Sequence, residues 1–161
     1  MTRRFSVLLA FVIGCSPGAR SAASAGPRPP APPSAARARI TLTYQGVAGW
    51  QLAAGGTTLL VDPYFSRPDL ESEAPISADL AAVRAHAPAH AAAILIGHSH
   101  ADHLLDAPAL ARLTGAELIG SESTAHYAGA AGVPASQIIT VKGGEDFEFP
   151  SFSVRVIPSL Q

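Results

Sequence analysis

Three histidines and one aspartate lie within six consecutive positions of this 161-residue chain, in the segment His98-Ser99-His100-Ala101-Asp102-His103. Half of the six histidines in the chain are therefore in one short segment. Imidazole nitrogens and carboxylate oxygens are ligands that suit zinc and related divalent ions. Because residues two apart in an extended segment point to the same side, we expect His98 and His100 to reach one ion together. Asp102 and His103 can then serve a neighbouring ion.

The residues on either side of this cluster predict how the chain positions it. Residues 91–97 form an apolar run without alternation, which predicts a strand buried on both faces. This strand would fix the backbone, and the loop after it would leave coordination positions open for water and substrate. Further strands are predicted at 39–44, 50–54, 57–61, 116–119, 137–141, 147–149 and 152–157, and helices at 77–85, 104–113 and 121–130. Strands that repeatedly precede helices indicate an α/β fold of mixed layers.

The composition is that of a globular protein with an uneven distribution of charge. Hydrophobic residues make up 48% of the chain, which is enough for the packed core of one domain. Six of the eleven basic residues lie in the first 39 positions, so the remainder carries five basic residues against all twelve acidic ones. This acidic balance disfavours binding to nucleic acid through bulk charge.

The N-terminal residues are typical of export from a bacterial cell. Residues 1–15 have a basic start and a short apolar stretch that ends at Cys15. The segment Val12-Ile13-Gly14-Cys15 resembles the lipobox of bacterial lipoproteins, in which the cysteine becomes a lipid-modified N-terminus; the alternative is plain secretion after cleavage at Ala23-Ser24-Ala25. Residues 16–38 contain six prolines and predict an extended tether. We therefore expect a domain at 39–161 that is anchored to a membrane of the cell envelope, facing the periplasm or the surface.

The cluster at 98–103 resembles the His-x-His-x-Asp-His signature of the metallo-β-lactamase fold superfamily at every defined position. The resemblance covers roughly residue 40 onward and includes the Gly55-Gly56 hairpin and the stretch Leu59–Phe65. Within the superfamily, the pattern is most similar to the branch of sugar-phosphate lactonases and N-acyl-phosphatidylethanolamine phospholipase D. The resemblance implies an α/β sandwich with αββα layers, of which this chain covers about the first αβ half.

The resemblance also implies a role for each residue of the cluster. His98 and His100 would bind the first of two divalent ions, and Asp102 and His103 would bind the second. Zinc is the expected metal, with manganese or iron as alternatives, because His and Asp bind all three. The ions would activate a water molecule, and Asp102 would hold or shuttle its proton. Asp62, which ends a strand before a proline, would orient the metal-binding loop.

The later ligands of the family are not evident in this sequence. After His103 the only histidine is His126, which is expected to be a partly exposed residue in the middle of a helix. The third histidine of the family usually follows a Pro-Ser-x segment, and here Pro158-Ser159-Leu160 is followed by Gln161. Either the glutamine replaces that ligand or the reading frame is interrupted close to it. We therefore expect a domain truncated at its C-terminus, with an exposed apolar sheet face.

The segment that follows Asp62 lies where the loop of the family borders the active site. Three of its residues are candidates for contact with substrate, namely Tyr64, Phe65 and Arg67. Contact with substrate and an ordinary loop role are both open for them.

Other histidines and aromatic residues are expected to be structural. His86 and His90 have a helical spacing of four, but Pro88 lies between them, so surface positions are favoured. Trp50 and the phenylalanines at 147, 149 and 152 are expected in the core.

Together these patterns predict a metal-dependent hydrolase that cleaves an ester, lactone, amide or phosphodiester bond in a small-molecule or lipid-like substrate. The alternative is a surface lipoprotein that retains the fold for binding without catalysis. This alternative is favoured because the distal ligands are not evident in the sequence. The intact cluster at 98–103 opposes it. A nuclease is disfavoured by the acidic domain.

Overall fold

The computed structural model describes residues 5–6, 39–69, 71 and 73–158. The predicted lipid attachment site Cys15, the tether at 16–38 and Gln161 lie outside the described residues. The domain boundaries at 15 and 38 therefore stay predictions. Among the described helices, none is both long enough and apolar enough to cross a membrane.

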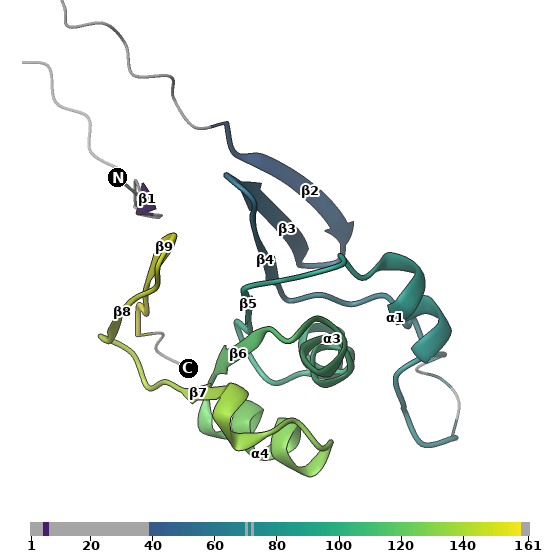
Figure 1. Ribbon diagram of the computed structural model, residues 1–161. Coiled ribbons are helices and arrows are strands. Elements are labelled where there is room, and N and C mark those ends of the chain that lie inside the picture. Colours follow the sequence, from purple (N-terminus) through teal and green to yellow (C-terminus); the bar gives the residue numbers. More distant parts are fainter. Residues whose placement is uncertain (1–4, 7–38, 70, 72, 159–161) are drawn as a thin grey trace, which may run out of the picture.

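A six-stranded mixed sheet forms the centre of the described chain (Figure 1). Its first three strands are antiparallel, and the pairs that follow are parallel. Gly55 and Gly56 have φ values of +56° and +86° and form the predicted tight turn between two of the antiparallel strands. In their order across the sheet, the strands are β2 (Thr41–Gly46), β3 (Gly49–Ala54), β4 (Thr57–Val61), β5 (Ala93–Leu95), β6 (Glu117–Gly120) and β7 (Ile138–Thr140).

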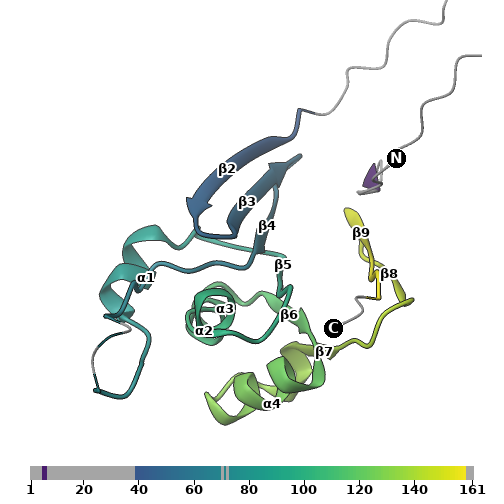
Figure 2. The same cartoon turned by 180° about the vertical axis from the view of Figure 1, so that it is seen from behind.

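Short helices follow the strands and pack on one side of the sheet, while a separate hairpin lies on the other side (Figures 1 and 2). This arrangement confirms the mixed α/β fold. The described helices are α1 (Leu80–His86), α2 (Ala101–Leu104), α3 (Ala107–Thr114), α4 (Glu122–Ala130) and the 3-10 helix Ala135–Gln137.

Two helix starts differ from the sequence prediction. Helix α1 begins after Asp79, and not after Ser77, because the Asp79 carboxylate accepts hydrogen bonds from the Ala81 and Ala82 N–H groups at 2.8 and 3.2 Å. The helix predicted at 104–113 begins later than expected, since α3 spans Ala107–Thr114, and a separate short helix, α2, ends at Leu104. Pro108 lies in the first turn of α3, where its lack of an N–H group removes no helical hydrogen bond.

The main core lies between the sheet and the helices. Leu60, Ile94 and Leu118 are register partners on three neighbouring strands, and each is fully buried. Leu110 and Ala111 of α3 are also fully buried in this cluster. Burial of each large apolar side chain contributes about 1.5–3 kcal/mol relative to exposure, so this row fixes the register of the strands that precede the histidine cluster.

A smaller core lies on the opposite face of the sheet. Leu59, Ala93, Ile119 and Phe152 are buried there. Phe152 comes from the antiparallel hairpin of β8 (Asp146–Glu148) and β9 (Phe152–Arg155), and β1 (Phe5–Ser6) pairs in parallel with β9. The Phe149 and Phe152 rings stack at 4.3 Å.

The expectation that Trp50 is a core residue is wrong. Its side chain is 41% exposed and contacts the Tyr44 ring at 5.0 Å between centroids. Tyr44 lies on β2 and Trp50 on β3, the two strands farthest from β7 in the sheet. Trp50 belongs to neither buried cluster of the described chain.

Candidate metal centre

The histidine cluster lies at the carboxyl end of β5, in the middle of the sheet. The backbone continues the β5 pairing for one more residue, because Ile96 N–H donates to the Ile119 carbonyl at 2.9 Å. The chain then leaves the sheet through Gly97, and His100 is the N-cap residue of α2. Asp102 and His103 are therefore in the first turn of a short helix, which carries them back toward His98.

The four side chains of the cluster converge on one region. The donor atoms of His98, His100 and Asp102 all lie within 4.8 Å of one another. His98 Nε2 is 3.1 Å from His100 Nδ1, and the His98 and His103 ring centroids are 3.8 Å apart. His103 Nε2 is 3.6 Å from Asp102 Oδ2. The structure thus brings together all four residues that the sequence predicted as ligands.

This geometry fits a divalent ion. Two donors that bind one zinc ion at about 2.0–2.1 Å in a tetrahedron lie about 3.4 Å apart. The 3.1 Å separation of the His98 and His100 nitrogens is close to that value. His98 and Asp102 are half-buried and His100 is exposed, so the donors are accessible from solvent.

Asp62, the residue after β4, connects this strand to the histidine cluster. Its side chain is buried, and Oδ1 accepts a hydrogen bond from Gly97 N–H at 2.7 Å. Asp62 Oδ2 lies 3.0 Å from His103 Nδ1, within ion-pair distance. That nitrogen is buried, and within the described chain it has no partner in hydrogen-bond geometry. The sequence predicted this supporting position for Asp62, and its effect on metal binding stays a prediction.

Gly97 is required by the close approach of Asp62. A Cβ atom at this position would lie 2.9 Å from Asp62 Oδ2, closer than carbon and oxygen atoms pack. Asp62 itself has a φ of +43°, a left-handed conformation that Asp and Asn tolerate better than most residues. The end of β4 and the glycine before His98 are therefore fitted to one another.

The loop after Asp62 is held by a buried carboxylate that sequence reasoning missed. Asp106, fully buried before α3, accepts hydrogen bonds from the Phe65 and Ser66 N–H groups and from the Ser66 hydroxyl. The only sequence signal was an acidic residue before the Ala107-Pro108 helix start.

The three predicted loop residues take different positions. Tyr64 is buried, and burial raises the pKa of its hydroxyl above the usual 10.0. Arg67 is exposed and lies 4.6 Å above the Tyr64 ring, while Phe65 stacks on His86 at 5.2 Å. Contact of these residues with substrate stays a prediction.

Two hollows adjoin the cluster and share Ser99. A polar one of about 570 Å³ is lined by Gly97, His98, Ser99, His100, Ser121 and Ser123. A more apolar one of about 210 Å³ is lined by Ile76, Ser99, Ala101, Leu104, Leu105 and Tyr127. The polar hollow therefore opens onto His98 and His100, whereas the apolar one borders the segment only at Ser99 and Ala101.

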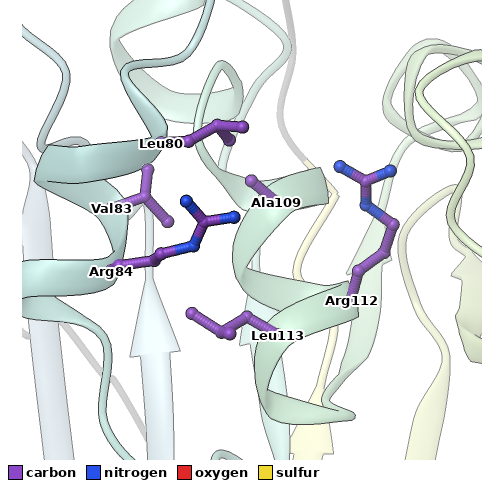
Figure 3. A pocket seen from close by; sticks show the side chains of 6 residues that line it. All are labelled: Leu80, Val83, Arg84, Ala109, Arg112 and Leu113. Carbon is purple, nitrogen blue, oxygen red and sulfur yellow. The ribbon is translucent and has the colours of Figure 1, made fainter.

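A third hollow, of about 330 Å³, lies between α1 and α3 and shares no residue with the cluster. In Figure 3, the Arg84 side chain extends from α1 across this groove toward α3. The groove is lined by Leu80, Val83, Arg84, Ala109, Arg112 and Leu113.

The other three histidines lie outside the cluster. His86 ends α1, His90 follows Pro88, and both are exposed, as predicted. His126 is an exposed residue of α4.

The sequence profile of the beta-lactamase superfamily domain matches residues 57–161, and the chain belongs to this family. A UPF0173 metal-dependent hydrolase from Anaeromyxobacter dehalogenans is 38% identical over 108 residues, covering 66% of this chain and 36% of the relative. One from Myxococcus xanthus is 29% identical over 162 aligned positions, covering 95% and 53%. The chain thus spans about a third to a half of the length of these curated relatives.

Among solved structures, the chain is similar to Igni18, a metallo hydrolase from Ignicoccus hospitalis. The TM-score is 0.49 at 22% identity, and the match covers 68% of this chain and 42% of that chain.

Proposed function

We propose that this protein is a metal-dependent hydrolase whose metal centre is built on His98, His100, Asp102 and His103. The observation that carries the proposal is the convergence of the His98, His100 and Asp102 donor atoms within 4.8 Å at the end of β5. The similarity to the metal-dependent hydrolases of Anaeromyxobacter dehalogenans and Myxococcus xanthus supports the same activity.

The proposed centre holds two divalent ions, with zinc as the favoured metal. His98 and His100 bind one ion, and Asp102 and His103 bind the other. Each pair of residues would supply two donors, and further protein groups, water or substrate would have to supply the rest. When bound, such ions supply Lewis acidity and lower the pKa of a coordinated water toward neutrality.

The residues of the chain have distinct tasks in this proposal. Asp102 would hold or pass the proton released during hydrolysis, since its half-buried carboxylate lies within 4.8 Å of the His98 and His100 donor atoms. Asp62 fixes the start of the metal-binding loop through Gly97 and keeps a negative charge 3.0 Å from His103 Nδ1. That charge favours the orientation in which the other His103 nitrogen faces the metal.

A polar and a more apolar hollow meet at Ser99 and have room for a small substrate with both kinds of group. We propose an ester, lactone, amide or phosphodiester with a small-molecule or lipid-like group. The similarity to lactonases and to N-acyl-phosphatidylethanolamine phospholipase D stays a prediction, as does the contact of Tyr64, Phe65 and Arg67 with substrate. We further propose that Cys15 carries a lipid anchor in a bacterial cell envelope, which mass spectrometry of the protein purified from membranes would test.

The activity is tested by hydrolysis of chromogenic ester, lactone and phosphodiester substrates in zinc- or manganese-loaded full-length protein. We expect turnover that a chelator abolishes and that added metal restores. The variant His98→Ala should lose it, whereas His126→Ala, on exposed α4, should retain it. Metal binding without turnover on any of these substrates would favour the binding-protein alternative, and turnover that survives His98→Ala would refute the proposed centre.

A further inference from the structure

Three hydroxyl groups form a compact cluster beside the proposed metal ligands. Ser99 Oγ lies 3.1 Å from Ser121 Oγ and 2.9 Å from Thr124 Oγ1. Ser121 Oγ lies 3.3 Å from Thr124 Oγ1 and also accepts a hydrogen bond from Thr124 N–H at 3.3 Å. Ser99 is the residue between His98 and His100, whereas Ser121 is the N-cap residue of α4 and Thr124 lies in its first turn. The cluster therefore ties the metal-binding loop to a helix that follows the neighbouring strand.

The α4 side of this contact is rigidly placed. Thr124 is fully buried, and a Cβ atom at Gly120 would lie 2.7 Å from Thr124 Cγ2. Gly120 ends β6, which pairs in parallel with β5. The Thr124 hydroxyl is thus held at a fixed height above the sheet, level with the chain as it leaves β5.

The metal-binding loop is consequently held at two places. On one side, Asp62 accepts from Gly97 N–H just before the first ligand. On the other side, the hydroxyl of Ser99, which lies between His98 and His100 in the sequence, forms hydrogen bonds with the Ser121 and Thr124 hydroxyls. The backbone of His98 lies between these two points, and His100 follows the second point as the N-cap residue of α2, so both restrict where the two imidazole side chains begin.

The geometry points to a positioning role for the Ser99, Ser121 and Thr124 hydroxyls: they form a clamp that sets the His98 and His100 imidazoles for metal binding. This inference rests on the proposed function, because it concerns the same metal centre. The clamp is distinct from the N-cap of α4. The cap needs only Ser121 and the Thr124 N–H, whereas the clamp needs the Thr124 hydroxyl.

A matched pair of substitutions at Thr124 separates the clamp from simple packing. Thr124→Val keeps the branched shape against Gly120 and removes the hydroxyl. Thr124→Ser keeps the hydroxyl and removes the methyl group. A packing role predicts that the serine variant is the worse of the two, and a clamp predicts the opposite.

The experiment measures Co²⁺ affinity and the visible absorption of bound Co²⁺ in the full-length protein, together with amide exchange of residues 97–103 without metal. We expect Thr124→Val to weaken Co²⁺ binding roughly 10-fold or more, to change the absorption spectrum and to speed up exchange in this segment. Thr124→Ser should stay within about 3-fold of the wild type, and so should Ser123→Ala. Ser123 lines the polar hollow with Ser99 and Ser121 but lies outside the three-hydroxyl cluster.

The possible failures are distinguishable. If Thr124→Val leaves Co²⁺ affinity, the absorption spectrum and amide exchange unchanged, the clamp is overturned and the metal centre stands. The same conclusion holds if Thr124→Ser loses more Co²⁺ affinity than Thr124→Val. A wild type that binds no Co²⁺ would refute the proposed function. In that case, faster exchange in Thr124→Val alone would still support the clamp as a restraint on the loop, and unchanged exchange would overturn it.

Discussion

Replacing Asp62 should weaken both the fold and the metal centre, because its two carboxylate oxygens have different partners. Oδ1 accepts from Gly97 N–H at 2.7 Å, and Oδ2 lies 3.0 Å from His103 Nδ1. Asp62→Asn retains an oxygen for Gly97 and tolerates the left-handed φ of +43°, but it removes the charge next to His103. Asp62→Ala removes both contacts and places a less tolerant residue in that conformation.

The expected magnitudes follow from these contacts. A hydrogen bond to a charged group contributes about 1.5–3 kcal/mol, and a left-handed alanine costs about 1–2 kcal/mol. Because the Gly97 N–H is only partly buried, we expect a decrease in the free energy of unfolding of about 2–4 kcal/mol for Asp62→Ala and about 1 kcal/mol for Asp62→Asn. Both variants should lose roughly 10- to 100-fold in affinity for zinc, since each loses the charge that orients His103.

Urea unfolding of the metal-free protein and calorimetric titration with zinc measure the two effects separately. The asparagine variant is the sharper probe, because its small loss of stability should accompany a large loss of affinity. Wild-type zinc affinity in Asp62→Asn would refute the orienting role. Equal stability of the alanine variant and the wild type would refute the structural role of the Gly97 contact.

Three further predictions concern the stability of the fold. Asp106→Ala should lower the free energy of unfolding by about 3 kcal/mol in urea, because three donors lose a fully buried acceptor; a loss below about 1 kcal/mol would contradict this. Gly97→Ala should destabilise by about 1–3 kcal/mol through overlap with Asp62, whereas Gly129→Ala, with open space in α4, should stabilise slightly in the same assay. The backbone N–H group of Lys142 holds the pKa of Glu145 below its usual 4.5, so the stabilisation is complete above that pH and is lost as the pH falls through the lowered pKa. Glu145→Gln should therefore destabilise in urea near pH 7 and converge with the wild type near pH 2, and a difference that grows in acid would be inconsistent with this.

The elements that position the site were predictable because local patterns agree with tertiary packing. The apolar run before His98 became a buried strand, and the Gly55-Gly56 turn fixed the hairpin before Asp62. The convergence of the four cluster residues also followed from their spacing, because all of them lie within six positions. Family membership was predictable from the same residues and is confirmed by the match over 57–161.

The contacts that hold the site in place could not be predicted, because they join residues far apart in the sequence. Asp106 reaches the backbone of a loop 40 residues earlier, and Ser99 meets Thr124 only because β5 and β6 are parallel neighbours. A hydroxyl or carboxylate has no periodicity that reveals such a partner. Trp50 was misplaced for a related reason, since residue type alone does not show which part of a sheet face is covered.

The most direct test of the proposed metal centre is the amount of zinc bound per chain after mild purification and equilibration at micromolar zinc, measured by elemental analysis. We expect at least one ion per chain in the wild type and in His126→Ala, and loss of bound zinc in the double variant His98→Ala with His100→Ala. Fewer than one ion per wild-type chain, or equal zinc in the double variant, would contradict a metal centre built on residues 98–103.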